Sequence, residues 1–172
     1  MTAMDAFQHT THGGGDDFAE VVEVLDGRGP WCLIGGLAVN AYVEPVYTLD
    51  ADIVLVAREL AWIRAELERR GFRTEEFPHS LNARRGASEL NIQFTTDPRY
   101  QDFLAQTERR PVLGIEVPVA SLENLIRGKT WAWSDTKRRA TKRKKDELDL
   151  LRIAEAHPGV RGLIPVEIVS QL

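Results

Sequence analysis

The sequence has almost no cysteine and no long apolar run. Cys32 is the one cysteine in 172 residues, which excludes an internal disulfide framework. Its neighbours in the apolar run WCLI predict a small core residue rather than a reactive thiol. No apolar run approaches the roughly 20 residues that a membrane-spanning helix needs. Residues 1–15 also lack the charged and apolar regions of a signal peptide, so we expect a cytoplasmic protein with no membrane association.

The remaining composition is that of an ordinary globular protein. Hydrophobic residues make up 43% of the chain and charged residues 28%. This length suits one domain. We expect a mobile tail over residues 1–15, an α/β core over residues 16–120, and a helical segment of the same domain over residues 121–172.

Periodicity and turn signals predict a mixed α/β (α+β) order, with helices flanking a small mixed sheet and a helical C-terminal third. Apolar periodicity of the helical kind occurs in six segments: 17–25, 37–43, 59–70, 97–107, 121–133 and 135–156. Short apolar or alternating runs indicate strands over 31–34, 50–56, 72–77, 81–85, 88–94 and 114–120. A last helical turn is expected after Pro158.

Two aspartates begin a strand that is otherwise apolar. Asp50 and Asp52 are two residues apart, so on a strand their carboxylates share a face about 6.7 Å apart. Two like charges raise each other's pKa unless a cation lies between them. Mg²⁺ accepts carboxylate oxygens and keeps open positions for substrate phosphates. The pair therefore indicates a metal site.

A pair of glycines lies just upstream of the aspartates. Gly35 and Gly36 stand between a buried strand and a predicted helix, where unobstructed backbone amides can approach an anion. Alone, such a pair is usually a plain turn. Followed by Thr48 and the two aspartates, it predicts donors for a triphosphate beside ligands for a metal, within reach of one nucleotide.

These motifs resemble those of a known superfamily. The stretch GGLAVNAY…EPVYTLDADIVLV resembles the core motif of the nucleotidyltransferase superfamily, the DNA polymerase β-like fold, in its minimal bacterial branch. The later stretches VPVASLENLIRGKTWAW and KRKKDELDLLRI are similar to the helical portion of AbiEii-like proteins, the toxins of type IV toxin–antitoxin systems. The resemblance extends from about residue 17 to residue 156.

The resemblance implies a function and a set of site residues. It implies transfer of a nucleoside monophosphate from a nucleoside triphosphate to a nucleic acid such as tRNA, or to a protein, by a toxin-like enzyme with an antitoxin partner. The glycines and Thr48 would hold the triphosphate, and the two aspartates would ligate Mg²⁺, or Mn²⁺ in its stead. Three further motif positions of AbiEii-like proteins fall on Lys129, Lys145 and Asp146. Lys129 can also be read as a helix-face lysine that covers apolar surface.

The sequence departs from the superfamily pattern at two positions. The superfamily usually carries a third carboxylate on a neighbouring strand, where this chain has Asn91. Glu89, two residues earlier, could substitute for it. Val46 stands where relatives often carry a basic residue. These departures leave three functions open: an active nucleotidyltransferase, a degenerate nucleotide- or nucleic-acid-binding module of the same fold, and a small-molecule, antibiotic-type nucleotidyltransferase.

One short segment concentrates positive charge in a chain whose net charge is −4. Seven of the nine residues from Lys137 to Lys145 are basic. On a helix they would leave no face uncharged, and they would oppose the macrodipole near its N-terminus. The run predicts contact with an anion such as substrate phosphates or RNA, unless it is a solvated turn. Asp146 and Asp149 share a helix face, and could reach Lys129 or the metal site, or form a structural salt bridge.

Overall fold

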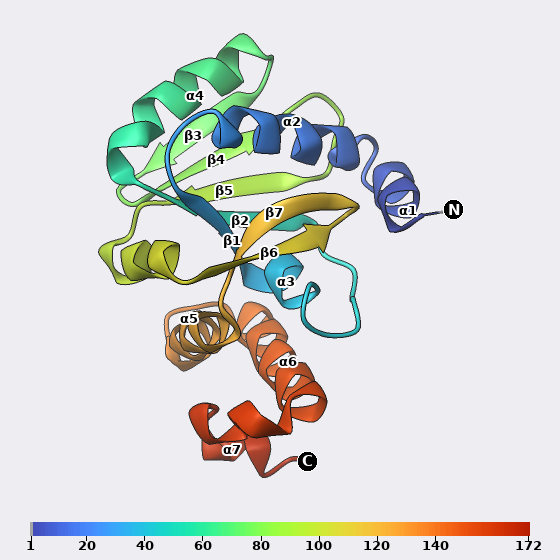
Figure 1. The fold of residues 1–172 in the computed structure, drawn as a ribbon, viewed down its shortest axis with the longest axis vertical. Helices are drawn as coiled ribbons and strands as arrows, with labels where there is room; N and C mark the ends of the chain where they lie inside the picture. The colour runs from blue at the N-terminus through green and yellow to red at the C-terminus, as the bar shows by residue number, and fades with distance from the viewer. Residues whose placement is uncertain (1) are drawn as a thin grey trace.

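The structure is a computed structural model that describes residues 2–172. Its centre is a seven-stranded mixed sheet with the strand order β3-β4-β5-β2-β1-β7-β6 (Figure 1). The strands are β1 (Trp31–Ile34), β2 (Asp50–Leu55), β3 (Arg73–Phe77), β4 (Ser80–Arg84), β5 (Asn91–Thr95), β6 (Thr107–Val112) and β7 (Ile115–Ala120). β2 pairs with β5, and β1 with β7, in parallel, while the other neighbours are antiparallel. The predicted mixed α/β fold is confirmed.

Helices cover the sheet in two groups (Figure 1). α2 (Gly14–Asp26) and α4 (Leu60–Arg69) contact each other on one side, above the apolar side chains of β4 and β5. On the other side lie the short α3 (Gly35–Val39) and the long C-terminal helices α5 (Leu122–Ser134) and α6 (Ala140–Ala156). Three 3-10 helices complete the connections: η1 (Ala57–Glu59), η2 (Pro98–Ala105) and η3 (Pro158–Leu163).

The pairing of β1 with β2 positions the predicted motifs. The two strands are antiparallel, with Ile34 opposite Asp52. The chain leaves β1 at Ile34, so Gly35 necessarily lies over the beginning of β2, where both aspartates are. On the other side of β2, strand β5 runs parallel and sets Asn91 opposite Asp50 and Gln93 opposite Asp52.

The N-terminal segment differs from the predicted tail. Residues 3–10 form helix α1 (Ala3–Thr10), which begins with a capping box between Thr2 and Asp5. Phe7 is only 8% exposed and joins the core, which gives this polar segment an apolar anchor. The single Phe among polar residues gave too weak a periodicity to predict the helix. Met1 lies outside the described residues.

Two further expectations need correction: one strand was missed, and one helix starts later than predicted. β6 was missed because its TERRPV sequence is polar and contains Pro111, a residue that edge strands tolerate. It forms a hairpin with β7 through Leu113 and Gly114, which both have positive φ. The last long helix begins at Ala140 instead of residue 135, so the first part of the basic run is a loop.

The chain ends in the helical turn that was expected, α7 (Val166–Val169). Within residues 2–172 no helix combines the length and the apolar character that crossing a membrane requires.

Candidate functional site

The two aspartates lie on the same face of β2, as predicted. Alternate positions of this strand are buried, whereas Asp50 and Asp52 are both partly accessible. The neighbouring strand β5 places the side-chain amides of Asn91 and Gln93 directly opposite the two aspartates. The Nδ2 of Asn91 donates a hydrogen bond of 3.4 Å to Asp50 Oδ1, and Gln93 stands opposite Asp52.

The predicted glycines and Thr48 gather around this pair. Gly35 has φ +73°, and a Cβ on it would overlap the Asp52 carboxylate, so glycine is required there for two reasons. A Cβ on Gly36 would lie 3.8 Å from the Thr48 Oγ1. That Oγ1 accepts a 3.3 Å hydrogen bond from the backbone N–H of Asp50. The sequence motif is therefore one continuous spatial unit.

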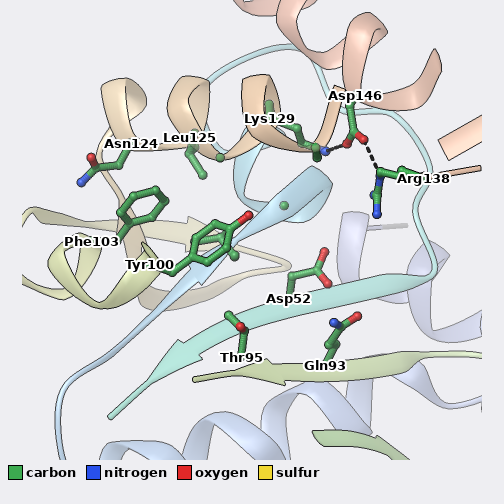
Figure 2. Close-up of a pocket in the computed structure, with 14 residues that line it drawn as sticks. Asp52, Gln93, Thr95, Tyr100, Phe103, Asn124, Leu125, Lys129, Arg138 and Asp146 are labelled. Atoms are coloured by element: carbon green, nitrogen blue, oxygen red, sulfur yellow. Dashed lines mark hydrogen bonds and ion pairs between the residues drawn. The ribbon is translucent and has the colours of Figure 1, made fainter. Parts of the chain in front are cut away.

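A cavity of about 180 Å³ opens above Asp52 (Figure 2). One end is polar, with Lys129 and Arg138 above the aspartate. The other end holds the rings of Tyr100 and Phe103 with Leu125 and Asn124. Ile34, Gly128 and Ala132 add further apolar lining to the cavity. A charged end beside an apolar end suits a ligand that joins an anionic group to a planar ring.

The aromatic end of this cavity is closely packed. Tyr100 meets Phe103 edge-to-face with ring centroids 5.1 Å apart, and Trp131 stacks on Phe103 at 5.9 Å. A Cβ at Gly128 would lie 3.2 Å from the Tyr100 ring, so this glycine allows the close contact between α5 and η2. Tyr100, Phe103 and Gly128 were not predicted from the sequence as site residues, because no short motif marks them.

Asp52 has no hydrogen-bond or ion-pair partner in the part of the chain that the structure describes. No hydrogen bond or ion pair from residues 2–172 reaches its carboxylate (Figure 2). Burial raises its pKa to about 6, and the nearby charge of Asp50 adds to the rise, while Lys129 opposes it. A half-buried carboxylate left unpaired beside a second one is suited to a cation from solvent.

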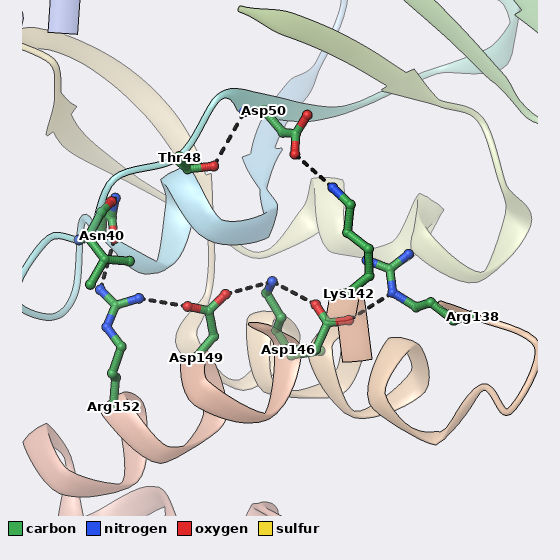
Figure 3. A network of polar contacts seen from close by, with 10 residues as sticks. Asn40, Thr48, Asp50, Arg138, Lys142, Asp146, Asp149 and Arg152 are labelled. Carbon is green, nitrogen blue, oxygen red and sulfur yellow. Dashed lines mark hydrogen bonds and ion pairs between the residues drawn. The ribbon is translucent and has the colours of Figure 1, made fainter. Parts of the chain in front are cut away.

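A buried ionic network joins the C-terminal helices α5 and α6 (Figure 3). Lys129 Nζ lies 2.9 Å from Asp146 Oδ1 and 2.7 Å from Asp149 Oδ2. Arg138 binds the second oxygen of Asp146 at 2.8 Å, and Arg152 binds Asp149 at 2.6 Å. Burial would lower the pKa of Lys129, but the two carboxylates outweigh it and the pKa is raised. Lys129 is therefore not a lysine that merely covers apolar surface.

Lys142, not Lys145, reaches the aspartates from α6. Its Nζ lies 3.2 Å from Asp50 Oδ2 (Figure 3). Lys142, Asp146 and Asp149 share a helix face, because they are spaced by four and three residues. Lys145 is one residue from Asp146, which turns it about 100° away, and it is exposed. The structure therefore does not bring the predicted Lys145 to the aspartates, and the spacing to Asp146 could have identified Lys142.

No third carboxylate joins Asp50 and Asp52. Glu89 lies before β5 and faces His12, 3.5 Å from its Nδ1, so it does not substitute for Asn91. Residues 2–172 contain no group of three or more metal-ligating His, Cys, Asp or Glu side chains. Two carboxylates still fit Mg²⁺, which usually takes one or two together with water and substrate phosphates.

The basic run is partly neutralised by the protein. Arg138, Lys142, Arg143 and Lys144 bind a carboxylate or a carbonyl. Lys137, Arg139 and Lys145 are exposed, and their side chains have no partner among residues 2–172. Within the described residues the run therefore divides into four residues paired inside the protein and three without a side-chain partner.

Comparison with known proteins identifies the fold. No protein-family model matches this chain, and no curated protein matches its sequence. A solution structure of the antibiotic-resistance factor ANT(2'')-Ia is 16% identical, covers 90% of this chain and 88% of its own, and has a TM-score of 0.62. The crystal structure of the same protein with adenylyl-2''-tobramycin is 17% identical, covers 90% and 93%, and scores 0.59.

A third solved structure points the same way. A protein from H. pylori, described as a proposed nucleotidyltransferase, is 15% identical over 95% of this chain and 75% of its own, with a TM-score of 0.58. The chain thus has the nucleotidyltransferase fold that its sequence predicted. At these identities the likeness concerns the fold alone, and the AbiEii-like subtype stays a prediction.

Proposed function

We propose that this protein transfers a nucleoside monophosphate from a nucleoside triphosphate to an acceptor, using Mg²⁺ or Mn²⁺ bound by Asp50 and Asp52. One observation carries the proposal: the two carboxylates share a face beneath Gly35, and Asp52 has no protein partner among the described residues. In a nucleotidyltransferase fold, an uncompensated carboxylate at that point is best explained by a divalent ion.

The chain's own residues have separable roles in this proposal. The backbone N–H groups at Gly35 and Gly36 begin a helix and are available to phosphate oxygens, with Thr48 beside them. Lys129 has three N–H donors and uses two on Asp146 and Asp149, which leaves one for the cavity. The metal, when bound, would neutralise the charge of the triphosphate and of the leaving pyrophosphate.

The nucleoside would occupy the apolar end of the cavity. Tyr100 and Phe103 offer ring edges and faces on which a base can stack, and Leu125 adds apolar contact. The polar end would hold the phosphates near Arg138. A triphosphate bound this way would have its α-phosphate near Asp52, where an acceptor hydroxyl could approach along β5.

A nucleic acid is the acceptor that the charges favour. Lys137, Arg139 and Lys145 are exposed cations without a side-chain partner among the described residues, and they suit RNA, tRNA included. A toxin role and a protein antitoxin rest on the AbiEii-like resemblance alone, and an antitoxin-like gene beside this one would support them. A small-molecule acceptor is the alternative that the antibiotic-resistance factor ANT(2'')-Ia suggests.

A second candidate function is nucleotide binding without chemistry. Asn91 and Gln93 bring amides to the strand where the superfamily usually has a carboxylate, and an amide cannot accept the proton of the attacking hydroxyl. General-base help contributes about 10²- to 10⁴-fold to such reactions. The same fold would then bind nucleotide or RNA and turn it over slowly or not at all.

One experiment separates these functions. Transfer of label from α-labelled nucleoside triphosphates to RNA or to the protein would be measured with Mg²⁺ or EDTA. The wild type is expected to transfer label only with the metal, Asp50→Ala and Asp52→Ala to lose transfer, and the exposed control Glu155→Ala to keep it. If the wild type binds nucleotide without transferring label, and Asn91→Asp gains transfer, the protein is the binding module. Transfer that survives Asp50→Ala would exclude the metal site.

A further inference from the structure

Three neighbouring strands present a polar groove next to the aspartates. On β4 and β5, Leu81, Ala83, Ile92 and Phe94 are buried on the face of the sheet opposite to that of Asp50. The alternate residues face the opposite side, where a groove of about 460 Å³ is lined by Arg73, Thr74, Glu75, Asn82, Arg84 and Asn91. Of these, only Asn91 belongs to the site described above.

The groove is connected to Asp50 by a row of side chains. Arg73 and Arg84 are directly opposite each other on β3 and β4. The Nε of Arg84 donates a 3.3 Å hydrogen bond to Asn91 Oδ1, and Asn91 in turn donates to Asp50. Because neighbouring strands are about 4.8 Å apart, Arg84 lies about 10 Å from Asp50 across the sheet. A ligand in the groove could therefore reach the aspartates with one end.

The charges of the groove select an anionic ligand. It contains two guanidinium groups and one carboxylate, that of Glu75. Arg73 has no ion-pair or hydrogen-bond partner for its side chain within residues 2–172. Guanidinium groups bind phosphate by paired hydrogen bonds. A polycationic acceptor such as an aminoglycoside would be repelled by the same groups.

Two other features fit a nucleic acid strand. Phe77 lies opposite Ser80 at the far end of β3 and is 44% exposed, which gives an aromatic surface for stacking a base. Asn82 lines the groove, and its Oδ1 has no hydrogen-bond partner among the described residues. Lys142 of α6 also contacts Asp50, with Nζ 3.2 Å from Oδ2, so cations lie near Asp50 from α6 as well as from the groove.

We infer that this groove binds the sugar-phosphate backbone of a single-stranded RNA acceptor and directs its terminal hydroxyl to the aspartates. As a statement about the reaction, it rests on the proposed function. The hydroxyl oxygen would form a bond to the α-phosphorus while the bond to the β-phosphate oxygen breaks. Pyrophosphate would leave, and the hydroxyl proton would pass to solvent. The RNA would grow by one nucleotide.

The test measures binding of a short fluorescein-labelled single-stranded RNA by fluorescence anisotropy over a series of KCl concentrations, without nucleotide. The variants are the double substitution Arg73→Ala with Arg84→Ala, the single substitution Phe77→Ala, and the control Arg58→Ala. Arg58 is 76% exposed and follows the other end of β2, away from the aspartates. Circular dichroism would verify that each variant is folded.

Each variant has its own expected result. The double substitution removes two phosphate contacts, so the negative slope of log K against log salt should become shallower by about 1.4, at about 0.7 per contact on a single strand. Phe77→Ala should weaken binding about tenfold at every salt concentration, with the slope unchanged. Arg58→Ala should match the wild type. An unchanged slope in the double variant, or no RNA binding at low salt, would overturn the inference.

Failure of the groove can be told apart from failure of the proposed function. If the wild type transfers no nucleotide but the double variant shows the shallower salt slope, the groove binds RNA and the proposed reaction is wrong. If the wild type transfers nucleotide to RNA and the double variant does so with an unchanged KM for RNA, the reaction stands and the groove does not. If the wild type transferred nucleotide to tobramycin and not to RNA, the inference that the groove binds an RNA acceptor would also be overturned.

Discussion

Lys142 on α6 and Asp50 on β2 form an ion pair, with Nζ 3.2 Å from Oδ2, although 92 residues separate them in the sequence. The lysine occupies one side of a carboxylate that we assign to a metal ion. Its side chain is 41% exposed and that of Asp50 33%, so the pair can open without burying a charge. Metal arrival would release the ammonium group toward the phosphates of the nucleotide.

Substituting Lys142 should therefore have opposite effects on metal and nucleotide. An exposed ion pair contributes about 0.2–1 kcal/mol. Lys142→Met should tighten Mn²⁺ binding in the absence of nucleotide by a few-fold at most, and it should raise the KM for the nucleoside triphosphate. Lys144→Met, whose lysine pairs with Glu147, should change neither value. Mn²⁺ titrations and initial rates of both variants would measure these two values. If Lys142→Met weakened metal and nucleotide binding equally, the metal would not replace Lys142 at Asp50.

Asp52→Asn should stabilise the metal-free protein at neutral pH. The folded-state pKa of about 6 exceeds the unfolded value of 3.8, so the folded protein is penalised once the carboxyl ionises. The difference in free energy of unfolding between variant and wild type should grow between about pH 4 and pH 6 and then level, at about 1–3 kcal/mol. Urea unfolding in EDTA over this range would measure it. A variant less stable than the wild type at pH 7 would contradict the unpaired charge.

Lys129 should be essential for stability. Its substitution by Met leaves Asp146 and Asp149 buried with one cation fewer. Breaking a buried ionic network in this way typically costs about 3–5 kcal/mol. Thermal and urea unfolding should show that loss for Lys129→Met, and a change within about 0.5 kcal/mol for Lys137→Met on the exposed loop. Equal stability of the two variants would mean that the network contributes little.

The two glycines should respond differently to alanine. Gly35→Ala meets both the positive φ and the Asp52 carboxylate, so we expect a loss of about 1–3 kcal/mol in stability. Gly36→Ala makes only ordinary contacts, at 3.7 Å to Asp149 and 3.8 Å to Thr48, and should fold normally. Its methyl group would lie toward the triphosphate, so nucleotide affinity should fall. Unfolding curves and nucleotide titrations would separate these effects, and wild-type affinity in Gly36→Ala would remove that glycine from the phosphate site.

The sequence predicted the centre of the site because the decisive residues are close together in the chain. Gly35, Thr48 and the two aspartates come from one antiparallel strand pair and its connection, so strand alternation and turn chemistry fix their relation. The family resemblance placed Asn91 at the third-carboxylate position on a neighbouring strand, and in the structure it lies opposite Asp50.

The remainder depends on contacts that local patterns do not encode. Helical spacing puts Lys142 on the face of Asp146, but its contact with Asp50 depends on where α6 lies relative to the sheet, which no local pattern encodes. The start of α6 at Ala140, five residues after the predicted start, was likewise not encoded locally. The aromatic end of the cavity joins η2 to α5, and helix α1 depends on a single buried phenylalanine. Such distant pairings appear only in the folded chain.

Binding of Mn²⁺ followed by electron paramagnetic resonance, with and without a non-hydrolysable nucleoside triphosphate, tests the metal site most directly. The wild type should bind Mn²⁺ more tightly when the nucleotide is present, and Asp50→Asn and Asp52→Asn should both abolish that gain while remaining folded. If the wild type binds no Mn²⁺ under either condition, or if both variants bind it as the wild type does, the two aspartates are not a metal site and nucleotidyl transfer at this position is excluded.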